Sequence, residues 1–276
     1  MNILKFITIP LIISFCSCGL KKNDNVKFTK LIFDLNIPEQ KNEFDKWVNN
    51  NLKDSINDSI SKYYARNLPS KDSFINQNYE DANYLVTSHC RGEWGGLVRF
   101  NNKQNRNIYK MESTCPLLID FREGKYYVLA SLSHGEGFTS IKTVENPEKL
   151  TDSTGYKILL DTFGLIANQF FPFNNKNYLI YTIDSLTILG KYENNRIVTI
   201  DTLINRMLPA QPYSMNYIKN GIYINEIYRH TTWGASEGPN RHEKTTGLIY
   251  VKKDTIVIGY QYKEWFTKNL ADLSED

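Results

Sequence analysis

Four histidines occur in the 276 residues, and two of them stand at matching distances from a repeated motif. His134 follows Tyr127 by seven residues, and His230 follows Tyr223 by seven. An imidazole can form hydrogen bonds, exchange a proton near neutral pH or bind a metal. Because equivalent positions of a repeat fold emerge on one face, we expect these histidines to lead into neighbouring loops, with His89 at a looser spacing.

Three glycine-containing loops follow these histidines, and each also contains a carboxylate. Two of the loops carry a tryptophan, whose flat face can stack on a ligand. We predict that the three loops line one mouth, and that its binding residues are His89, Trp94, His134, His230, Trp233 and Glu237. The alternative is that glycine and histidine here only turn the strands and cap backbone groups.

Catalysis at the same loops would need two carboxylates across a cleft, and Glu93 with Glu136 is the candidate pair for glycoside hydrolysis. Residues 234–238 match G-x-S-x-G, but Pro239 follows where the serine elbow needs a helix. The chain contains no H-E-x-x-H, phosphate-binding glycine loop, calcium-loop spacing or C-x-x-C motif. We therefore expect no metal and no cofactor, although the three loop histidines could form a metal site if their loops converged.

Composition excludes several classes of protein. The chain is 41% hydrophobic and 23% charged, which is typical of a folded globular protein. Its 33 basic and 30 acidic residues are spread along the sequence, so no clustered basic surface points to nucleic acid. A mean hydropathy of −0.45 and a single apolar run, at the N-terminus, exclude a protein with many membrane spans.

That N-terminal run is predicted to be an export signal. Lys5 supplies the positive charge, and about ten apolar residues follow, too few to span a bilayer as a helix. The run ends in Phe15-Cys16-Ser17-Cys18-Gly19, which resembles the lipobox of bacterial lipoproteins. The resemblance implies a signal peptide over 1–17, acylation of Cys18, and a tether over 18–30. An ordinary secretory leader is the alternative.

The resemblance also implies a location. Gly19 after the acylated cysteine is similar to the outer-membrane sorting pattern of lipoproteins, so we expect a lipid-anchored protein of the cell envelope. The anchor makes the membrane the first expected partner. Whether the body faces the periplasm or the exterior stays open.

Two further cysteines, Cys90 and Cys115, would lie in an oxidising compartment. We expect a disulfide between them, with two buried free thiols as the alternative. A zinc pair is excluded because neither cysteine has a second one two to four residues away.

Apolar residues three, four or eight apart predict an amphipathic helix over 36–68 that packs on the main body, or else binds a partner. From 79 to 262 the apolar period changes to two, which predicts a β domain. A short closing helix is expected within 263–276. Hairpin turns are predicted at 123–125, 174–176, 193–195, 219–221 and 252–254.

An apolar triplet recurs in the β domain, centred on Leu85, Tyr127, Leu179 and Tyr223, with spacings of 42, 52 and 44 residues. Such spacings are typical of a four-stranded propeller blade. We therefore predict an all-β fold with a small or irregular β-propeller-like repeat of four or five antiparallel units. A β-sandwich or a curved meander is the alternative.

Together these features favour a lipid-anchored binding module for a glycan, a peptide or an envelope protein. A hydrolase or lyase that acts on envelope or extracellular polymers through the same loops is the first alternative. An accessory subunit without a small-molecule site is the second.

Overall fold

The computed structural model describes residues 27–52, 75–133, 136–151, 154–208, 215–218, 221–230 and 240–267. Three antiparallel sheets and one mixed sheet follow one another along the chain. The first sheet contains β2 (Ile75–Glu80), β3 (Tyr84–Cys90), β4 (Gly96–Asn102) and β5 (Ile108–Glu112). The second contains β6 (Pro116–Arg122), β7 (Lys125–Leu132), β8 (Phe138–Val144) and β9 (Lys157–Phe163). The third contains β10 (Ile166–Phe173), β11 (Lys176–Ile183), β12 (Leu186–Glu193) and β13 (Arg196–Ile204).

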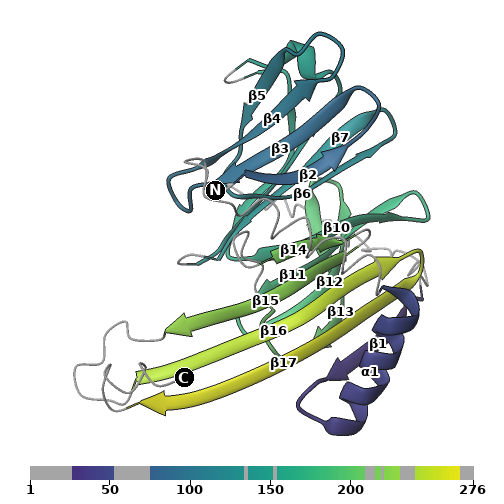
Figure 1. The fold of residues 1–276 in the computed structure, drawn as a ribbon, viewed down its shortest axis with the longest axis vertical. Helices are drawn as coiled ribbons and strands as arrows, with labels where there is room; N and C mark the ends of the chain where they lie inside the picture. The colour runs from purple at the N-terminus through teal and green to yellow at the C-terminus, as the bar shows by residue number, and fades with distance from the viewer. Residues whose placement is uncertain are drawn as a thin grey trace, which may run out of the picture.

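The fourth sheet combines both ends of the described chain (Figure 1). It contains β14 (Met215–Ile218), β15 (Gly221–His230), β16 (Asn240–Lys252) and β17 (Thr255–Thr267). Strand β1 (Thr29–Asp34) joins its edge by pairing in parallel with β17. The described helices are α1 (Pro38–Asn51) and a short 3₁₀ turn, η1 (Pro147–Lys149).

The predicted antiparallel four-stranded units are confirmed for three sheets, and the fourth adds β1 to four antiparallel strands. Leu85, Tyr127, Leu179 and Tyr223 all lie in the second strand of a sheet, in β3, β7, β11 and β15. All five predicted turn positions fall between paired strands. A closed ring of sheets is not found in the described part of the chain.

Helix α1 confirms the predicted packing of its apolar stripe on the main body. Phe44 is buried against the fourth sheet, where a Cβ on Gly259 would overlap the Phe44 ring. The Trp47 ring lies 5.5 Å from the Tyr250 ring. The helix begins at Pro38 and ends at Asn51, and residues 53–68 of the predicted helix lie outside the described residues.

Three element boundaries differ from the sequence prediction. Residues 263–267, expected to begin a closing helix, continue β17, because each pairs with a residue of β16. Residues 268–276 lie outside the described residues. The tether expected over 18–30 ends earlier, since β1 begins at Thr29, and the first sheet begins at Ile75 rather than at 79.

The hydrophobic core joins the sheets in succession. One cluster lies between the first and second sheets and includes Val86, Phe100 and Val128. A larger cluster joins the second, third and fourth sheets, with Leu179 and Ile258 among its fully buried residues. Burial of this apolar surface is the main stabilising term, and it holds each sheet against the next one along the chain.

Polar contacts join successive sheets at the end that carries the turns between their first and second strands. We call this the basal end. The Tyr126 hydroxyl donates to Asp81 Oδ2 at 2.6 Å, which connects the second sheet to the β2–β3 turn. Arg122 Nη2 donates to Asn177 Oδ1 at 3.0 Å and connects the second sheet to the third. Phe28, just before β1, packs on the Tyr178 ring of the third sheet.

The opposite end carries the turns between second and third strands, and we call it the loop end. Here the second residue of the third strand bonds to the segment that follows the fourth strand. Thr139 Oγ1 accepts a hydrogen bond from the Ala167 amide at 2.8 Å and donates to the Leu165 carbonyl at 3.0 Å. One hydroxyl of the second sheet therefore bonds to the residue just before β10 and to a residue at the start of β10.

The third sheet repeats this arrangement. Thr187 Oγ1 accepts from the Leu208 amide at 3.2 Å and donates to the Arg206 carbonyl at 2.7 Å. As with Thr139, the two backbone groups belong to residues two apart. We call each such contact a sheet junction. Because Leu208 is fully buried, its amide would lose its partner if this hydroxyl were absent.

The fourth sheet runs between the same two ends. The Thr29 amide donates to the Asp254 carbonyl at 2.8 Å, so the start of β1 adjoins the β16–β17 turn. In Figure 1 this turn lies at the right, whereas the arrowheads of β15 and β17 lie at the left. Since Phe28 packs at the basal end, the β16–β17 turn is basal and the β15–β16 connection belongs to the other end.

The Tyr126–Asp81 contact predicts a pH dependence of stability. Burial alone raises the pKa of Asp81, but hydrogen bonds from Tyr126 and from the Tyr84 and Asn83 amides outweigh it and lower that pKa. A lowered carboxyl pKa stabilises the fold above pH 4 and is lost as the pH falls through it. We expect Tyr126→Phe to cost about 1 to 2 kcal/mol at pH 7 and progressively less below about pH 4.

Urea unfolding at pH 7 and pH 3 measures this effect. Tyr109→Phe is the matched control, since the Tyr109 hydroxyl receives only a long 3.4 Å bond from Asn107 Nδ2. An equal cost of Tyr126→Phe at both pH values would contradict the role given to the Asp81 carboxylate.

Candidate functional site

The β3–β4 turn is tightly closed. Cys90 pairs with Gly96 at its base, and the Arg91 amide donates to the Gly95 carbonyl at 2.9 Å. Gly92 and Gly95 have φ angles of +65° and +93°, which residues with a Cβ rarely adopt. The glycines noted in the sequence are therefore needed to form this turn.

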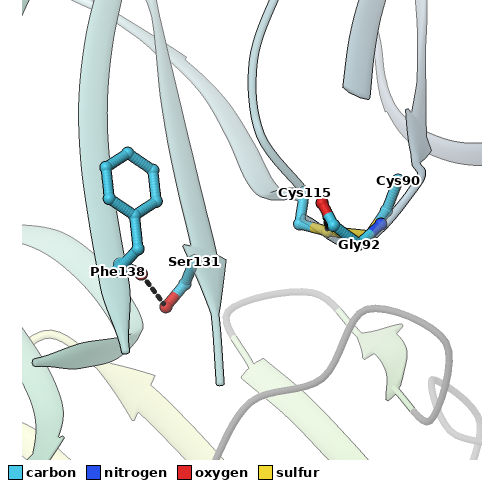
Figure 2. Close-up of a disulfide and its surroundings, with 5 residues drawn as sticks. All are labelled: Cys90, Gly92, Cys115, Ser131 and Phe138. Carbon is cyan, nitrogen blue, oxygen red and sulfur yellow. Dashed lines mark hydrogen bonds between the residues drawn. A yellow bond between two sulfur atoms is a disulfide. The ribbon is translucent and has the colours of Figure 1, made fainter. Parts of the chain in front are cut away.

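A disulfide between Cys90 and Cys115 is present, as predicted (Figure 2). It joins the β3–β4 turn to the segment that connects the first sheet to the second. Cys115 is fully buried, and the Gly92 amide donates to Cys90 Sγ at 3.3 Å. The bond joins the last residue of β3, a second strand, to the segment that follows the fourth strand, whereas Thr139 and Thr187 reach that segment from a third strand. The first sheet junction is therefore covalent and starts from the neighbouring strand.

Trp94 projects from this fixed turn into solvent. Its side chain is 82% exposed, the largest exposed fraction of any large apolar side chain described. Glu93 and Arg91, on the same turn, are also exposed. An exposed indole on the same turn as two charged residues offers a stacking face together with hydrogen-bonding groups.

The β7–β8 turn lies at the same end of the molecule. The Ser131 amide donates to the Cys115 carbonyl at 3.1 Å, so this hairpin is bonded to one residue of the disulfide. Glu136 is exposed on the turn. Phe163, at the end of β9, is 74% exposed and lies 5.3 Å from the Phe138 ring. The loop end thus presents the two most exposed large apolar side chains described, Trp94 and Phe163.

The predicted histidines fall on strands where they are described. His89 is half-buried in β3, where its backbone pairs with Leu97. His230 is the last residue of β15, and its backbone pairs with His242. Both positions lie at the loop end of a second strand, as the repeat predicted. His134, Trp233, Glu237 and Cys18 lie outside the described residues.

Sequence reasoning missed Phe163 and the two junction threonines. A sequence signal for Phe163 exists, since an aromatic residue followed by Gly164 ends a strand beside a connection. Thr139 and Thr187 carry no comparable signal, because their bonding partners lie about 20 to 30 residues further along the chain.

No group of three or more His, Cys, Asp or Glu residues suited to a metal ion occurs among the residues with described positions. In the same part of the chain, no helix is long and apolar enough to cross a membrane. The chemical resources of the loop end are therefore aromatic faces, carboxylates, a guanidinium and backbone groups.

We expect the disulfide to contribute measurably to the free energy of unfolding. Replacing both cysteines, Cys90→Ser with Cys115→Ser, releases a loop with a sequence separation of 25 residues. On the chain-entropy model this costs about 3 to 4 kcal/mol. Guanidinium unfolding should give that loss for the double variant and a similar loss for the wild type under reducing conditions. A loss below about 1 kcal/mol in both would show that the junction holds without its covalent bond.

Comparison with known proteins finds no matching family model, no matching curated protein and no matching solved structure.

Proposed function

We propose that this chain is an exported, lipid-anchored protein of the cell envelope that binds a glycan at its loop end. In this proposal the four consecutive sheets form an irregular propeller-like body, and the acylated Cys18 tethers that body to the outer membrane. The protein acts by binding rather than by catalysis.

The observation that carries the proposal is the setting of Trp94. Its side chain is 82% exposed, so the face of the indole is open to a ligand. Here the turn that carries it is fixed by two glycines, backbone hydrogen bonds and a disulfide. A rigid turn loses little conformational entropy when a ligand stacks on its indole, which favours binding.

A glycan fits this chemistry better than an apolar protein patch does. The face of a sugar ring stacks on an indole, and its hydroxyls bond to carboxylates and guanidinium groups such as those of Glu93 and Arg91. Both of these residues are exposed beside Trp94. A polar rim around one aromatic anchor is typical of small polar-ligand sites.

Glycan hydrolysis is the second candidate, because Glu93 and Glu136 are both exposed at the loop end on turns connected through Cys115. It predicts that Glu93→Gln or Glu136→Gln abolishes release of reducing ends from a bound polysaccharide. Binding without turnover by the wild type would exclude it.

The test is binding of the full chain, held in detergent, to an array of bacterial envelope glycans and free polysaccharides. Trp94→Ala should weaken the Kd for the strongest glycan about 30-fold, the effect of removing a tryptophan worth about 2 kcal/mol. Ile108→Ala is the control, since Ile108 is 53% exposed but begins β5 at the basal end. It should leave the Kd unchanged.

Two results would contradict the proposal. If no glycan binds the wild type, glycan recognition is wrong. If glycans bind equally well to wild type and Trp94→Ala, the site lies elsewhere on the molecule.

A further inference from the structure

We propose that the basal end is a membrane-facing surface that contacts anionic lipid headgroups through lysines at the start of β1 and at the β16–β17 turn. The inference rests on the lipid anchor of the proposed function and adds the orientation of the body. It directs the loop end, with Trp94, away from the bilayer.

The packing of Phe28 fixes where the N-terminal segment joins the folded body. Phe28 is only 6% exposed and its ring lies 4.9 Å from that of Phe173 and 5.1 Å from that of Tyr178. The next residue, Thr29, pairs with Thr255 and donates its amide to the Asp254 carbonyl. The tether therefore leaves the body at the basal end, beside the β16–β17 turn.

The tether is short. Ten residue steps separate Cys18 from the buried Phe28, and at 3.3 to 3.6 Å per residue they span at most about 35 Å. An acylated Cys18 would hold the basal end within that distance of the bilayer. The loop end, at the far side of the sheets, would be the more distant of the two.

Positive charge is concentrated around this exit. Lys252 and Lys253 are exposed on the turn next to Asp254, and Lys27 is exposed beside Phe28. The tether itself adds Lys21, Lys22 and one acid, Asp24. On the described residues, Lys27, Lys252 and Lys253 against Asp254 leave +2 at this exit.

Basic residues next to a lipid anchor are attracted to anionic headgroups, and they add to the membrane affinity that the acyl chain provides. Such residues occur in the tether sequence and on the described β16–β17 turn. Their attraction to the bilayer therefore orients the body as well as holding it.

Energy transfer from single dyes to headgroup-labelled acceptor lipids tests this orientation. The acylated full chain is placed in vesicles containing phosphatidylglycerol, with a dye at Asp254→Cys or at Glu136→Cys. Asp254 is exposed on the β16–β17 turn and Glu136 at the loop end, so each variant replaces one exposed carboxylate and leaves the lysines in place. Transfer from position 254 should exceed transfer from position 136 at least twofold. In phosphatidylcholine vesicles, or with the added change Lys252→Glu, the difference should shrink.

Equal transfer from both sites, or stronger transfer from position 136, would overturn the orientation. A difference that is identical in both lipids and unaffected by Lys252→Glu would overturn the role of the lysines. Mass spectrometry of the same preparation shows whether Cys18 is acylated. An unmodified Cys18 overturns the anchor and this inference together, whereas an acylated Cys18 without the transfer difference overturns this inference alone.

Discussion

The structure depends on how each sheet is held to the segment that leaves it. In the second and third sheets, one threonine hydroxyl bonds to an amide and a carbonyl two residues apart. In the first sheet, the Cys90–Cys115 disulfide joins the end of the second strand to the segment that follows the fourth strand. The hydrogen bonds within a four-stranded antiparallel sheet do not by themselves fix its angle to the next sheet in the chain. These sheet junctions, together with the shared core, supply that constraint.

The two ends of the molecule are held by different interactions. The loop end is held by a disulfide and buried hydroxyls, and it presents Trp94 and Phe163 on a rigid support. The basal end is held by a carboxylate, a guanidinium and the packing of Phe28. The proposed binding site and the proposed anchor therefore lie at opposite ends, an arrangement that would keep a ligand site clear of the membrane.

The hairpin turns could be predicted from the sequence, because the residues of a turn themselves determine its backbone conformation. Asn174 and Asn175 adopt φ angles of +48° and +56°, which asparagine tolerates, so their turn was predictable. The helix expected from 263 failed because pairing with β16 overrides the local pattern. Glu93, Trp94 and the disulfide could be placed at one loop from sequence. Phe163 could not be placed at the same end of the molecule, since its pairing with Phe138 forms only when the second sheet folds.

The most direct test of the account is native-state hydrogen exchange of the Ala167 and Leu208 amides. Both bond to a threonine hydroxyl instead of a strand partner. If the sheet junctions hold the loop end rigid, both amides should exchange only through global unfolding, as slowly as the central strands. Exchange as fast as that of exposed turn amides would show that the junctions open on their own and would contradict a rigid loop end.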